Sequence, residues 1–567
     1  MRGALLTTSA IRDIEHRALA SSGEGALMRR AAEALAGVCE RLLRDLPART
    51  PVLALVGPGN NGGDALLAAA ILSQRGHLAQ ALALQPDPPA AADAARVWRD
   101  WCGAGRTLAG VADLDVLLAQ GPLVIDGLFG IGLTRPLPDA AAAIVRRVAQ
   151  AGVPVVAVDV PSGLDADRGS VVGPDGAGAM RATVTVTMIA DKPGLHTGAG
   201  AALAGEVVVA DLGTGPLEAG STPAAPGGTA RCGIGTLLGA TAFGGWIATR
   251  ARDSHKGRFG DVLVLGGAPG MRGASWLAAL GAQAVGAGRV RVARPDSPGD
   301  GAGLDALHPE LMTRRLAAWA VPPGNTDAAR RADAAICALG SADAIVAGCG
   351  LGIDETARAW VDAALAHPAP LVLDADALNV IAADPGLRAT VVLRATVVLR
   401  AAVAVRAAVT VRAPTDGDPM RTAAPSPTIL TPHPLEAARL LGSSTAEVQR
   451  DRVDAARTLA RLFGAFVALK GAGTVIAHPD GEWAINGSGG PILATAGTGD
   501  VLAGTIGGLL ASGVPAARAA ALGVWLHGEA GDALAREPGY TASIGLPAGE
   551  LPAAIRARIN RLAAARS

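Results

Sequence analysis

The segment Pro51–Gly76, PVLALVGPGNNGGDALLAAAILSQRG, decides the fold of the first half of the chain. An apolar run leads into a glycine-rich turn and then into a long run of alanine, leucine and isoleucine. This order predicts a strand, a loop and a helix, the repeating unit of parallel sheets. Because the apolar run does not alternate with polar residues, we expect helices on both faces of the sheet.

The same plan recurs along the rest of the chain. Further strands are expected within 122–133, 153–167, 182–190 and 205–213, and a second strand–loop–helix series begins at residue 261. We therefore predict an α/β protein with two parallel-sheet domains, at 1–215 and 246–567. Residues 215–233 are rich in Gly, Pro and Ala and predict an interdomain linker, to which we assign residues 216–245.

Composition excludes several classes of function. The 567 residues carry a formal net charge of zero, which argues against an electrostatic nucleic-acid or membrane partner. We expect neither a transmembrane segment nor a signal peptide, because charges or glycines break every long apolar run. The five cysteines are scattered without a CxxC pair, which is typical of reduced cytoplasmic thiols and argues against a zinc site.

Lysine is rare in this chain. Of 50 basic residues only Lys192, Lys256 and Lys470 are lysines, and each lies in a glycine-containing stretch. Because arginine and lysine are not equivalent in a tight site, a retained lysine suggests a specific role. Chance survival is the alternative.

Residues 387–413 break the pattern of the second domain. Arginine recurs there every six residues, at 388, 394, 400, 406 and 412. In a strand, this even period would keep every arginine on one face. The near-identical units indicate a tandem insertion with high β-propensity and no catalytic part, and we expect its deletion to leave catalysis largely intact.

Polar residues cluster at the predicted strand ends of the first domain. Adjacent asparagines favour neither helix nor strand, so Asn60 and Asn61 are assigned to a loop that also carries Asp64. Asp126 and Ser162 add oxygens at neighbouring strand ends, and oxygen ligands favour alkali or alkaline-earth ions over zinc. Asp159 is then the candidate acid/base. Turn chemistry with ordinary Asx caps is the alternative.

The stretch Ile492–Gly513, ILATAGTGDVLAGTIGGLLASG, places a single carboxylate where a glycine loop becomes a buried helix. Free N–H groups at a helix start, approached through glycines, suit a phosphoryl group. Asp500 would lie beside it and accept a proton from an attacking hydroxyl. Alternatively, Asp500 only caps the helix.

Other polar residues of the second domain also follow predicted strands. Asp374 and Asp376 follow one strand, His433 and Glu436 another, and Lys470 a third, where it would meet a nucleotide phosphate. Together with the glycine-cradled acid they predict hydroxyl attack on a terminal phosphoryl group. No GxxxxGK[ST] motif occurs, so this is not a P-loop enzyme.

Ten motifs occur in a fixed order along the chain. They are GPGNNGGD, DGLFGIGLTRP, VDVPSGLD and DKPGLHTG in the first half, and HKGRFGDVLVLGG, HPELM, DADALN, LTPHPLE, LKGAGT and ATAGTGDVLAG in the second. In this order they resemble the bifunctional NAD(P)H-hydrate repair enzymes, in which an NAD(P)H-hydrate epimerase is fused to an ADP-dependent (S)-NAD(P)H-hydrate dehydratase. The resemblance implies a Rossmann-like first domain and a ribokinase-like second domain.

The resemblance also implies the reactions. Hydrated NADH or NADPH, with water added across the nicotinamide 5,6 bond, is epimerised at C6 by the first domain. The second domain uses ADP to phosphorylate the hydroxyl and then eliminates phosphate, which restores the cofactor and releases AMP. The resemblance implies K⁺ in the first half and Mg²⁺ in the second, and we expect a homo-oligomer.

Site residues follow from the motif positions. In the first domain the resemblance assigns the hydrate to Asn60, Asn61, Gly62, Gly63, Asp64, Gly130, Ile131, Gly132, Leu133, Thr134, Arg135, Pro136 and Asp159, and potassium to Asn61, Asp126 and Ser162. In the second it assigns the hydrate to Ala274, Gly350 or Gly352, His433 and Asp500, and the adenine nucleotide to Lys470, Gly471, Ala472, Gly473, Thr474 and Gly499. Asp500 and Asp159 are the implied catalytic residues. Ala65, Phe129 and Ile131 depart from the family pattern.

The second domain alone would also permit a plain small-molecule kinase, with the first domain as a non-catalytic nucleotide-binding scaffold. The fused first domain argues against this alternative. The product distinguishes the two, since a kinase leaves a stable phosphoester.

Overall fold

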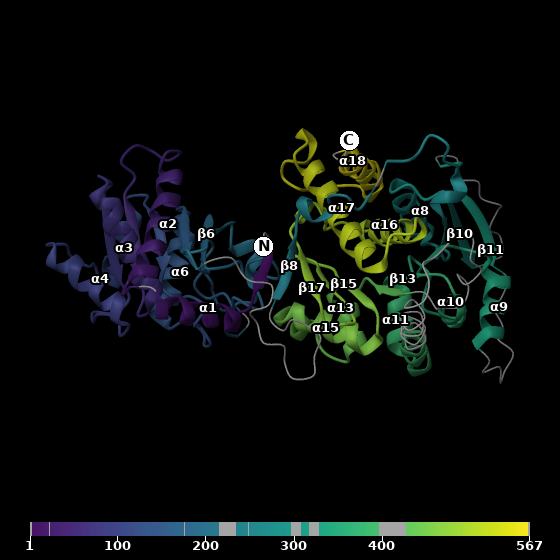
Figure 1. The fold of residues 1–567 in the computed structure, drawn as a ribbon, viewed down its shortest axis with the longest axis horizontal. Helices are drawn as coiled ribbons and strands as arrows, with labels where there is room; N and C mark the ends of the chain where they lie inside the picture. The colour runs from purple at the N-terminus through teal and green to yellow at the C-terminus, as the bar shows by residue number, and fades with distance from the viewer. Residues whose placement is uncertain are drawn as a thin grey trace. The chain divides into compact units, whose positions relative to one another are not determined.

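The computed structural model describes residues 3–21, 23–174, 176–214, 234–247, 249–295, 308–316, 328–395 and 427–564. The chain divides into two compact units, Met1–Leu237 and Leu238–Ser567. Each unit is built on a sheet covered by helices (Figure 1). The predicted two-domain α/β architecture is therefore confirmed. Among the helices described, none has both the length and the apolarity needed to cross a bilayer.

The sheet of the first unit is entirely parallel, in the order β3–β2–β4–β5–β6–β7. The predicted strands at 122–133, 153–167, 182–190 and 205–213 all form. The strands are β2 (Val52–Val56), β3 (Ala79–Ala83), β4 (Leu123–Gly127), β5 (Val155–Val158), β6 (Val184–Met188) and β7 (Glu206–Ala210).

Helices cover both faces of this sheet, as the unbroken apolar runs predicted. Along β2, Val52, Ala54 and Val56 pack with α2, α3 and α4, whereas Leu53 and Leu55 pack with α5 and α6. The helices of the unit are α1 (Thr8–Ser21), α2 (Ala26–Leu43), α3 (Asn60–Gln74), α4 (Ala92–Gly103), α5 (Leu114–Leu118), α6 (Asp139–Ala151) and α7 (Gly200–Leu203).

The range predicted as a linker contains folded structure at its end. Residues 215–233 lie outside the described residues, but β8 (Ile234–Leu238) pairs antiparallel with β1 (Ala4–Leu6). A 3-10 helix, η3 (Ala240–Phe243), follows and buries Phe243 completely. The described residues therefore form regular structure from residue 234, inside the range 216–245.

The second unit has a mixed sheet in which the strands from β15 to β11 are parallel and β16 and β17 are antiparallel. The order is β17–β16–β15–β14–β13–β12–β9–β10–β11. The strands are β9 (Asp261–Leu265), β10 (Arg289–Pro295), β11 (Met312–Leu316), β12 (Ala344–Ala347), β13 (Leu371–Leu373), β14 (Thr428–Leu430), β15 (Phe466–Leu469), β16 (Val475–Ala477) and β17 (Trp483–Asn486).

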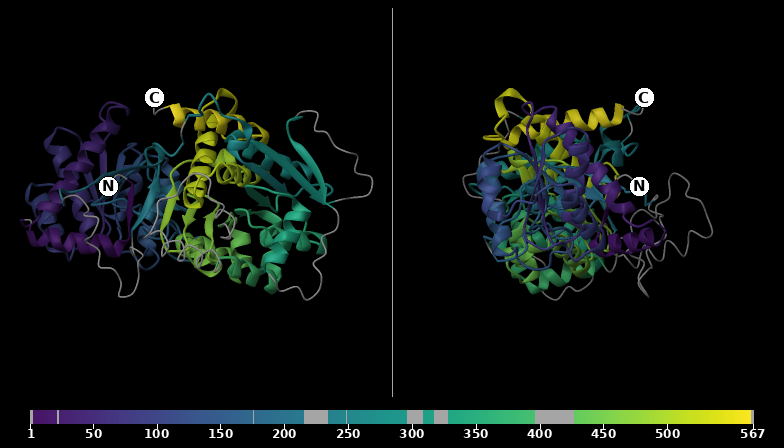
Figure 2. Two further views of the ribbon diagram at one scale, coloured as in Figure 1. Left: turned by 45° about the vertical axis from the view of Figure 1, so that its right-hand side comes forward. Right: turned by 90° about the vertical axis from the view of Figure 1, so that its left-hand side faces the viewer.

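The main core of the second unit lies between these strands and α8 (Arg272–Ala284), α16 (Thr498–Ala511), α17 (Ala516–Ala535) and α18 (Leu551–Ala564). Val262 and Val264 of β9, Val346 of β12 and Val372 of β13 face this core. Figures 1 and 2 show the remaining helices away from this layer. They are α9 (Ala328–Leu339), α10 (Glu355–Ala366), α11 (Ala375–Ala383), α13 (Pro434–Leu441), α14 (Thr445–Arg450) and α15 (Arg452–Phe463).

The first part of the repeat is helical and belongs to the core. Residues 385–395 form a helix in which Leu387, Val391 and Arg394 are buried. The Arg394 guanidinium donates to the carbonyl groups of Leu365 and Ala369, among others. Residues 387–395 are therefore helical although their strand propensity is high, and the effect of deleting 387–413 on activity stays a prediction. Residues 396–413, with Arg400, Arg406 and Arg412, lie outside the described residues.

Candidate functional site

The adjacent strands β2, β4 and β5 of the first unit end at one edge of its sheet, beside a cavity of about 970 Å³. Ligands bind at this edge in parallel α/β sheets. The cavity is lined by most of the hydrate-binding residues expected in this domain, namely Asn60, Asn61, Asp64, residues 130–136 and Asp159.

The predicted asparagine loop is wrong in one respect. Asn60 starts α3, so Asn60–Asp64 form its first turn rather than a loop. Gly62 and Gly63 do not line the cavity. A Cβ at Gly62 would lie 2.2 Å from the Gly57 carbonyl oxygen, and one at Gly63 would lie 2.7 Å from Ala94 Cβ. These glycines allow the first turn of α3 to pack closely against Gly57 and Ala94. This close packing explains why a sequence of low helix propensity forms a helix here.

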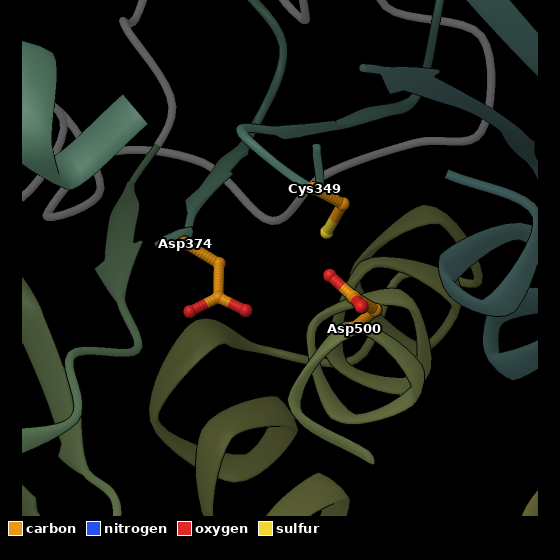
Figure 3. A group of neighbouring side chains, drawn as sticks. All are labelled: Cys349, Asp374 and Asp500. Atoms are coloured by element: carbon orange, nitrogen blue, oxygen red, sulfur yellow. The ribbon is translucent and has the colours of Figure 1, made fainter. Parts of the chain in front are cut away.

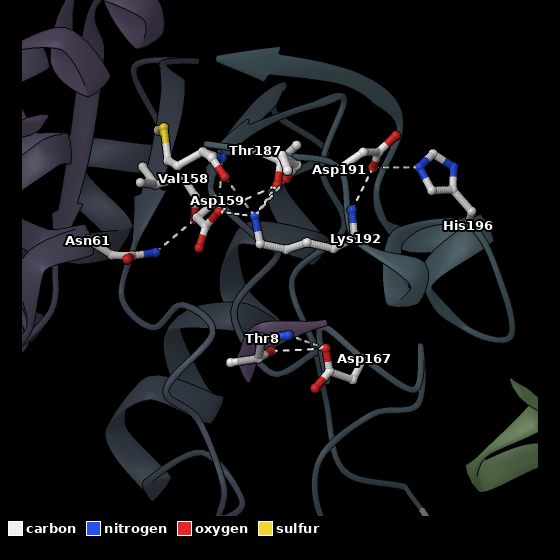
Figure 4. A network of polar contacts seen from close by, with 11 residues as sticks. Thr8, Asn61, Val158, Asp159, Asp167, Thr187, Asp191, Lys192 and His196 are labelled. Carbon is white, nitrogen blue, oxygen red and sulfur yellow. Dashed lines mark hydrogen bonds and ion pairs between the residues drawn. The ribbon is translucent and has the colours of Figure 1, made fainter. Parts of the chain in front are cut away.

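Asp159 forms a buried ion pair with a lysine (Figure 4). The Lys192 ammonium lies 2.6 Å from Asp159 Oδ1 and also donates to Thr187 Oγ1 and to the carbonyl oxygens of Met188 and Ala190. The Met188 N–H donates to the same carboxylate oxygen. Asp159 has φ of 67°, an uncommon conformation for a residue other than glycine, so the backbone is held in a special geometry at the cavity wall.

Of the three residues expected to bind potassium, Asp126 and Ser162 are in direct contact. Asp126 is fully buried, and its oxygens accept from the Ser162 hydroxyl at 2.7 Å and from the Ser162 N–H at 2.8 Å. Burial raises the Asp126 pKa to about 6, against these hydrogen bonds. The Asn61 amide donates its Nδ2 proton to the Val158 carbonyl, and its Oδ1 lies against Gly130, where a Cβ would be 2.5 Å away.

A second acid on the cavity wall has a perturbed pKa. Asp64 is 8% exposed, and burial raises its pKa well above the usual range, reinforced by the charges of Asp159, Glu15 and Asp93. Asp64 is therefore favoured as a neutral acid, whereas Asp159 has a cationic partner. Two carboxyl groups in such different surroundings are typical of acid and base pairs in active sites.

Ala65, which departs from the family pattern, fits this first domain without a steric conflict. Its methyl group faces Gly127, where an added Cβ would lie 2.5 Å from Ala65 Cβ. The glycine opposite therefore provides the space that the alanine needs.

In the second unit, Asp500 lies in the first turn of α16, as the sequence predicted. The residue before the helix, Gly497, has φ of 90°, a conformation that favours glycine. No capping hydrogen bond from the Gly497 position is formed, and Asp500 is not the N-cap. Burial raises the Asp500 pKa to about 7, and the charge of Asp374 contributes to this rise.

Lys470 and Gly499 come together with acids beside Asp500. The Lys470 ammonium lies 2.5 Å from Asp374 Oδ1 and 3.9 Å from Glu436 Oε2. Burial alone would lower the Lys470 pKa, but the two carboxylates raise it overall. A Cβ at Gly499 would be 3.4 Å from Lys470 Nζ, so the glycine leaves the ammonium accessible from α16.

His433 connects to the same group through Glu436. The His433 ring lies with Nε2 3.2 Å from Glu436 Oε1, and its Nδ1 accepts from the Leu435 N–H at the start of α13. The His433 side chain remains 46% exposed. His433, between Pro432 and Pro434, is therefore the N-cap of α13, and one side of its ring is exposed to solvent.

The remaining predicted residues lie at loop and helix starts. Ala274, in the first turn of α8, meets Gly350, where a Cβ would be 3.1 Å from its methyl group. The Gly352 N–H donates to Asp376. Residues 470–474 connect β15 and β16 as an antiparallel hairpin rather than a strand followed by a helix.

Cys349, Asp374 and Asp500 place their ligand atoms within 4.8 Å of one another (Figure 3). The Cys349 thiol points to the Asp500 carboxylate, and burial raises the pKa of the thiol well above its usual value. The two carboxylates provide hard oxygen ligands for Mg²⁺, whereas a protonated thiol does not.

Lys192 and Cys349 belong to these sites, but the sequence pattern assigned them no role there, whereas Asp374 and Glu436 were expected at strand ends of the second domain without an assigned ligand. Of the two residues without a role, only Lys192 had a usable sequence signal, since it is one of three lysines in an arginine-rich chain. Cys349 follows β12 without any distinguishing spacing.

Two family models match the chain. The model described as YjeF-related protein N-terminus matches residues 24–194, and the model described as NAD(P)H-hydrate dehydratase matches residues 262–399 and 412–549. The second match omits residues 400–411, so the stretch without a counterpart in the family is shorter than the predicted insertion 387–413.

Among curated relatives, the bifunctional NAD(P)H-hydrate repair enzyme Nnr of Mycobacterium leprae is 37% identical over 94% of this chain and 94% of its own length. The enzyme of the same name from Moorella thermoacetica is 36% identical over 89% and 87%.

Among solved structures, the ADP/ATP-dependent NAD(P)H-hydrate dehydratase of Bacillus subtilis, co-crystallised with ATP/Mg²⁺, is 28% identical, with a TM-score of 0.42. It covers 57% of this chain and 98% of the Bacillus chain. By the identity and coverage of the curated relatives, the chain belongs to the family of bifunctional NAD(P)H-hydrate repair enzymes.

Proposed function

We propose that this chain repairs hydrated NADH and NADPH in two steps. The first unit interconverts the R and S hydrates, and the second unit dehydrates the S hydrate at the expense of ADP. The observation that carries the second activity is Asp500 in the first turn of α16, beside Gly499 and the Lys470–Asp374 pair. Membership of the repair-enzyme family supports both activities.

For epimerisation, the hydrate occupies the cavity of the first unit, against Asn60, Asn61 and residues 130–136. The hydroxyl at C6 is next to the ring nitrogen, so it leaves as water once it is protonated and returns to the other face once a proton is removed. Asp64 is suited to donate the proton, because burial keeps it neutral. Asp159, paired with the Lys192 ammonium at the cavity wall, is suited to accept one.

Potassium fits the oxygen-rich group of Asn61, Asp126 and Ser162. A carboxylate, a hydroxyl and an amide oxygen are ligands that hard cations prefer, and the buried Asp126 carboxylate has no basic side chain among its hydrogen-bond donors described above. The ion would supply positive charge that keeps Asp126 ionised and holds substrate oxygens at this edge.

For dehydration, the hydrate lies against Ala274, Gly350 or Gly352, and His433, with ADP at Gly499 and residues 470–474. Asp500 accepts the proton of the C6 hydroxyl while that oxygen bonds to the β-phosphorus of ADP and the bond to AMP breaks. Loss of phosphate from C6 and of a proton from C5 then restores the double bond. Mg²⁺ bound with the nucleotide, near Asp374 and Asp500, would neutralise phosphate charge.

The test supplies hydrated NADH with ADP, with ATP or with no nucleotide, and follows the absorbance of the restored dihydronicotinamide. Restoration with free phosphate and AMP supports the proposal. A stable phosphoester in place of NADH would instead identify a kinase and overturn it.

We further propose a cytoplasmic location and a homo-oligomeric state. The free cysteines Cys39, Cys102, Cys337 and Cys349 support a reducing compartment. Oligomeric state stays a prediction from the sequence, and sedimentation velocity of the full chain tests it.

A further inference from the structure

Arg452 occupies a costly position at the start of α15. It is the first residue of the helix, where the helix dipole disfavours a positive charge. It is also only 1% exposed, and burial lowers its pKa to about 10. Arginine is rarely buried to this extent without specific partners, so its contacts explain why it is there.

Those contacts lie behind the proposed nucleotide loop. Arg452 Nη2 donates to the carbonyl oxygens of Leu469 and Lys470, each at 3.1 Å. Its Nη1 donates to Gln449 Oε1 at 2.7 Å, which fixes the orientation of the guanidinium plane. The N–H of Lys470 donates to the Pro432 carbonyl at 2.8 Å. The peptide groups on both sides of Lys470 are therefore held, and with them the direction of its side chain towards Asp374.

The loop packs directly on the guanidinium group. Gly471 has φ of 138°, and a Cβ at this position would lie 2.9 Å from both terminal nitrogens of Arg452. No side chain fits between the loop and the arginine without displacing one of them. The first residues of the loop therefore rest on Arg452 as well as being hydrogen-bonded to it.

We propose that Arg452 is the positioning residue of the nucleotide loop. By fixing the carbonyl groups of Leu469 and Lys470, it holds residues 470–474 in the conformation that receives the phosphates of ADP. It acts on nucleotide affinity and not on the chemical step, because the hydrogen bonds to Gln449, Leu469 and Lys470 go to protein groups and its side chain is buried beneath the loop. This inference rests on the proposed ADP-dependent dehydration.

The experiment compares full-length Arg452→Met and Arg452→Lys with the wild type. Loss of charged hydrogen bonds to two buried carbonyl groups should raise the KM for ADP by roughly 10- to 100-fold in Arg452→Met. We expect kcat at saturating ADP to change by less than about threefold, and the KM for the hydrate to stay the same. Arg452→Lys keeps the charge but lacks the fork, so its ADP KM should lie between the two.

Arg461→Met is the matched control, because Arg461 lies on the same helix with its side chain 49% exposed. It should leave every constant unchanged. Epimerisation by the first unit, measured on the same preparations, normalises for protein amount, and the melting temperature of the second unit reports its folding. A folded Arg452→Met variant with the wild-type ADP KM would overturn the inference. So would a variant with a lower kcat, a lower melting temperature and both KM values raised by the same factor, because that pattern indicates a general structural defect. If Arg452→Met does not fold, an unchanged ADP KM in Arg452→Lys overturns it.

The wild-type chain distinguishes failure of this inference from failure of the proposed ADP-dependent dehydration. A wild-type chain that does not use ADP refutes the proposed dehydration. A wild-type chain that uses ADP, together with an Arg452→Met variant of normal ADP affinity, refutes only the role of Arg452.

Discussion

Each unit contains a lysine–aspartate pair beside its proposed acid/base residue, but the two pairs are arranged differently. In the first unit the partner of Lys192 is Asp159 itself. In the second unit the partner of Lys470 is Asp374, and Asp500 lies next to the pair. The lysine therefore neutralises the reacting acid in one site and only a neighbour of it in the other.

The burial of the two lysines follows the same division. The Lys192 side chain is 0% exposed and its ammonium has four acceptors within the protein, whereas the Lys470 side chain is 18% exposed. Lys192 is fully used in holding Asp159, while Lys470 keeps a face for an anionic ligand. Similar lysine–aspartate pairs can thus have different roles: in one site the lysine stabilises a buried aspartate, and in the other it can also bind an anionic ligand.

The largest effect is expected for Lys192→Met. Removing the cation leaves Asp159 buried without its partner, which should lower the free energy of unfolding of the first unit by about 3–5 kcal/mol and abolish epimerisation. Dehydration of the S hydrate should persist below the melting temperature. Thermal unfolding and both activities, measured on one preparation, check this.

A double variant sharpens that result. Lys192→Met with Asp159→Asn removes both charges, so it should recover much of the stability but none of the epimerisation. Epimerisation by the single Lys192→Met variant at the wild-type rate would show that Asp159 does not need its counter-ion.

Asp500→Asn should slow dehydration by roughly 10²- to 10⁴-fold, the usual contribution of a positioned base. ADP affinity should change little, because Lys470, Asp374 and residues 471–474 remain, and epimerisation should be unchanged, because the first unit is untouched. The raised pKa means that ionised Asp500 destabilises the folded state as the pH rises from about 4 to 7, so the variant should melt no lower than wild type at pH 8. Near-normal turnover would contradict the base role.

The pH dependence of dehydration tests how the Cys349 thiol influences Asp500. With a pKa raised to about 7, Asp500 should make kcat/KM for dehydration rise with pH and level off above that value. The Cys349 hydrogen bond favours the ionised form, so Cys349→Ala should move this limb to higher pH and slow the reaction at pH 6 by roughly two- to fivefold. A limb that stays in place in Cys349→Ala would exclude the thiol as an influence on Asp500.

The smallest effect is expected for deletion of residues 400–411, which the dehydratase model leaves unmatched. Both activities should change by less than about twofold, because the dehydratase model has no counterpart for these residues. Arg394→Met is the contrasting variant. It removes a buried guanidinium that bonds several carbonyl groups, and it should lower the melting temperature of the second unit. A wild-type melting temperature in Arg394→Met would show that these hydrogen bonds do not stabilise the second unit.

The sequence identified elements wherever local pattern and burial agree. Unbroken apolar runs such as Val52–Val56 become parallel strands, and the polar residues that end them, Asp126 and Asp159, meet at one edge. Where burial overrides propensity, prediction fails. Asn60 and Asn61 begin a helix because glycines allow close packing. Residues 385–395 are helical despite the β-branched run 390–392, and they bury Leu387, Val391 and Arg394.

Contacts between distant segments limit what could be predicted of the sites. Lys192 is 33 residues from Asp159, and Lys470 is 96 residues from Asp374. The sequence places each residue at a strand end but does not say which ends are adjacent, since the strand order of the second unit crosses from β12 to β9. The Cys349–Asp500 contact likewise joins two segments that are far apart in the sequence.

The complete enclosure of Lys192 has a chemical consequence. An amine-reactive reagent needs an unprotonated, solvent-accessible amino group, and Lys192 is fully buried, whereas Lys470 is partly exposed. Because carboxylates raise the Lys470 pKa, acylation at alkaline pH should inactivate dehydration and spare epimerisation, and ADP should protect the activity that is lost. A single reagent would then abolish one activity of a bifunctional chain and leave the other intact.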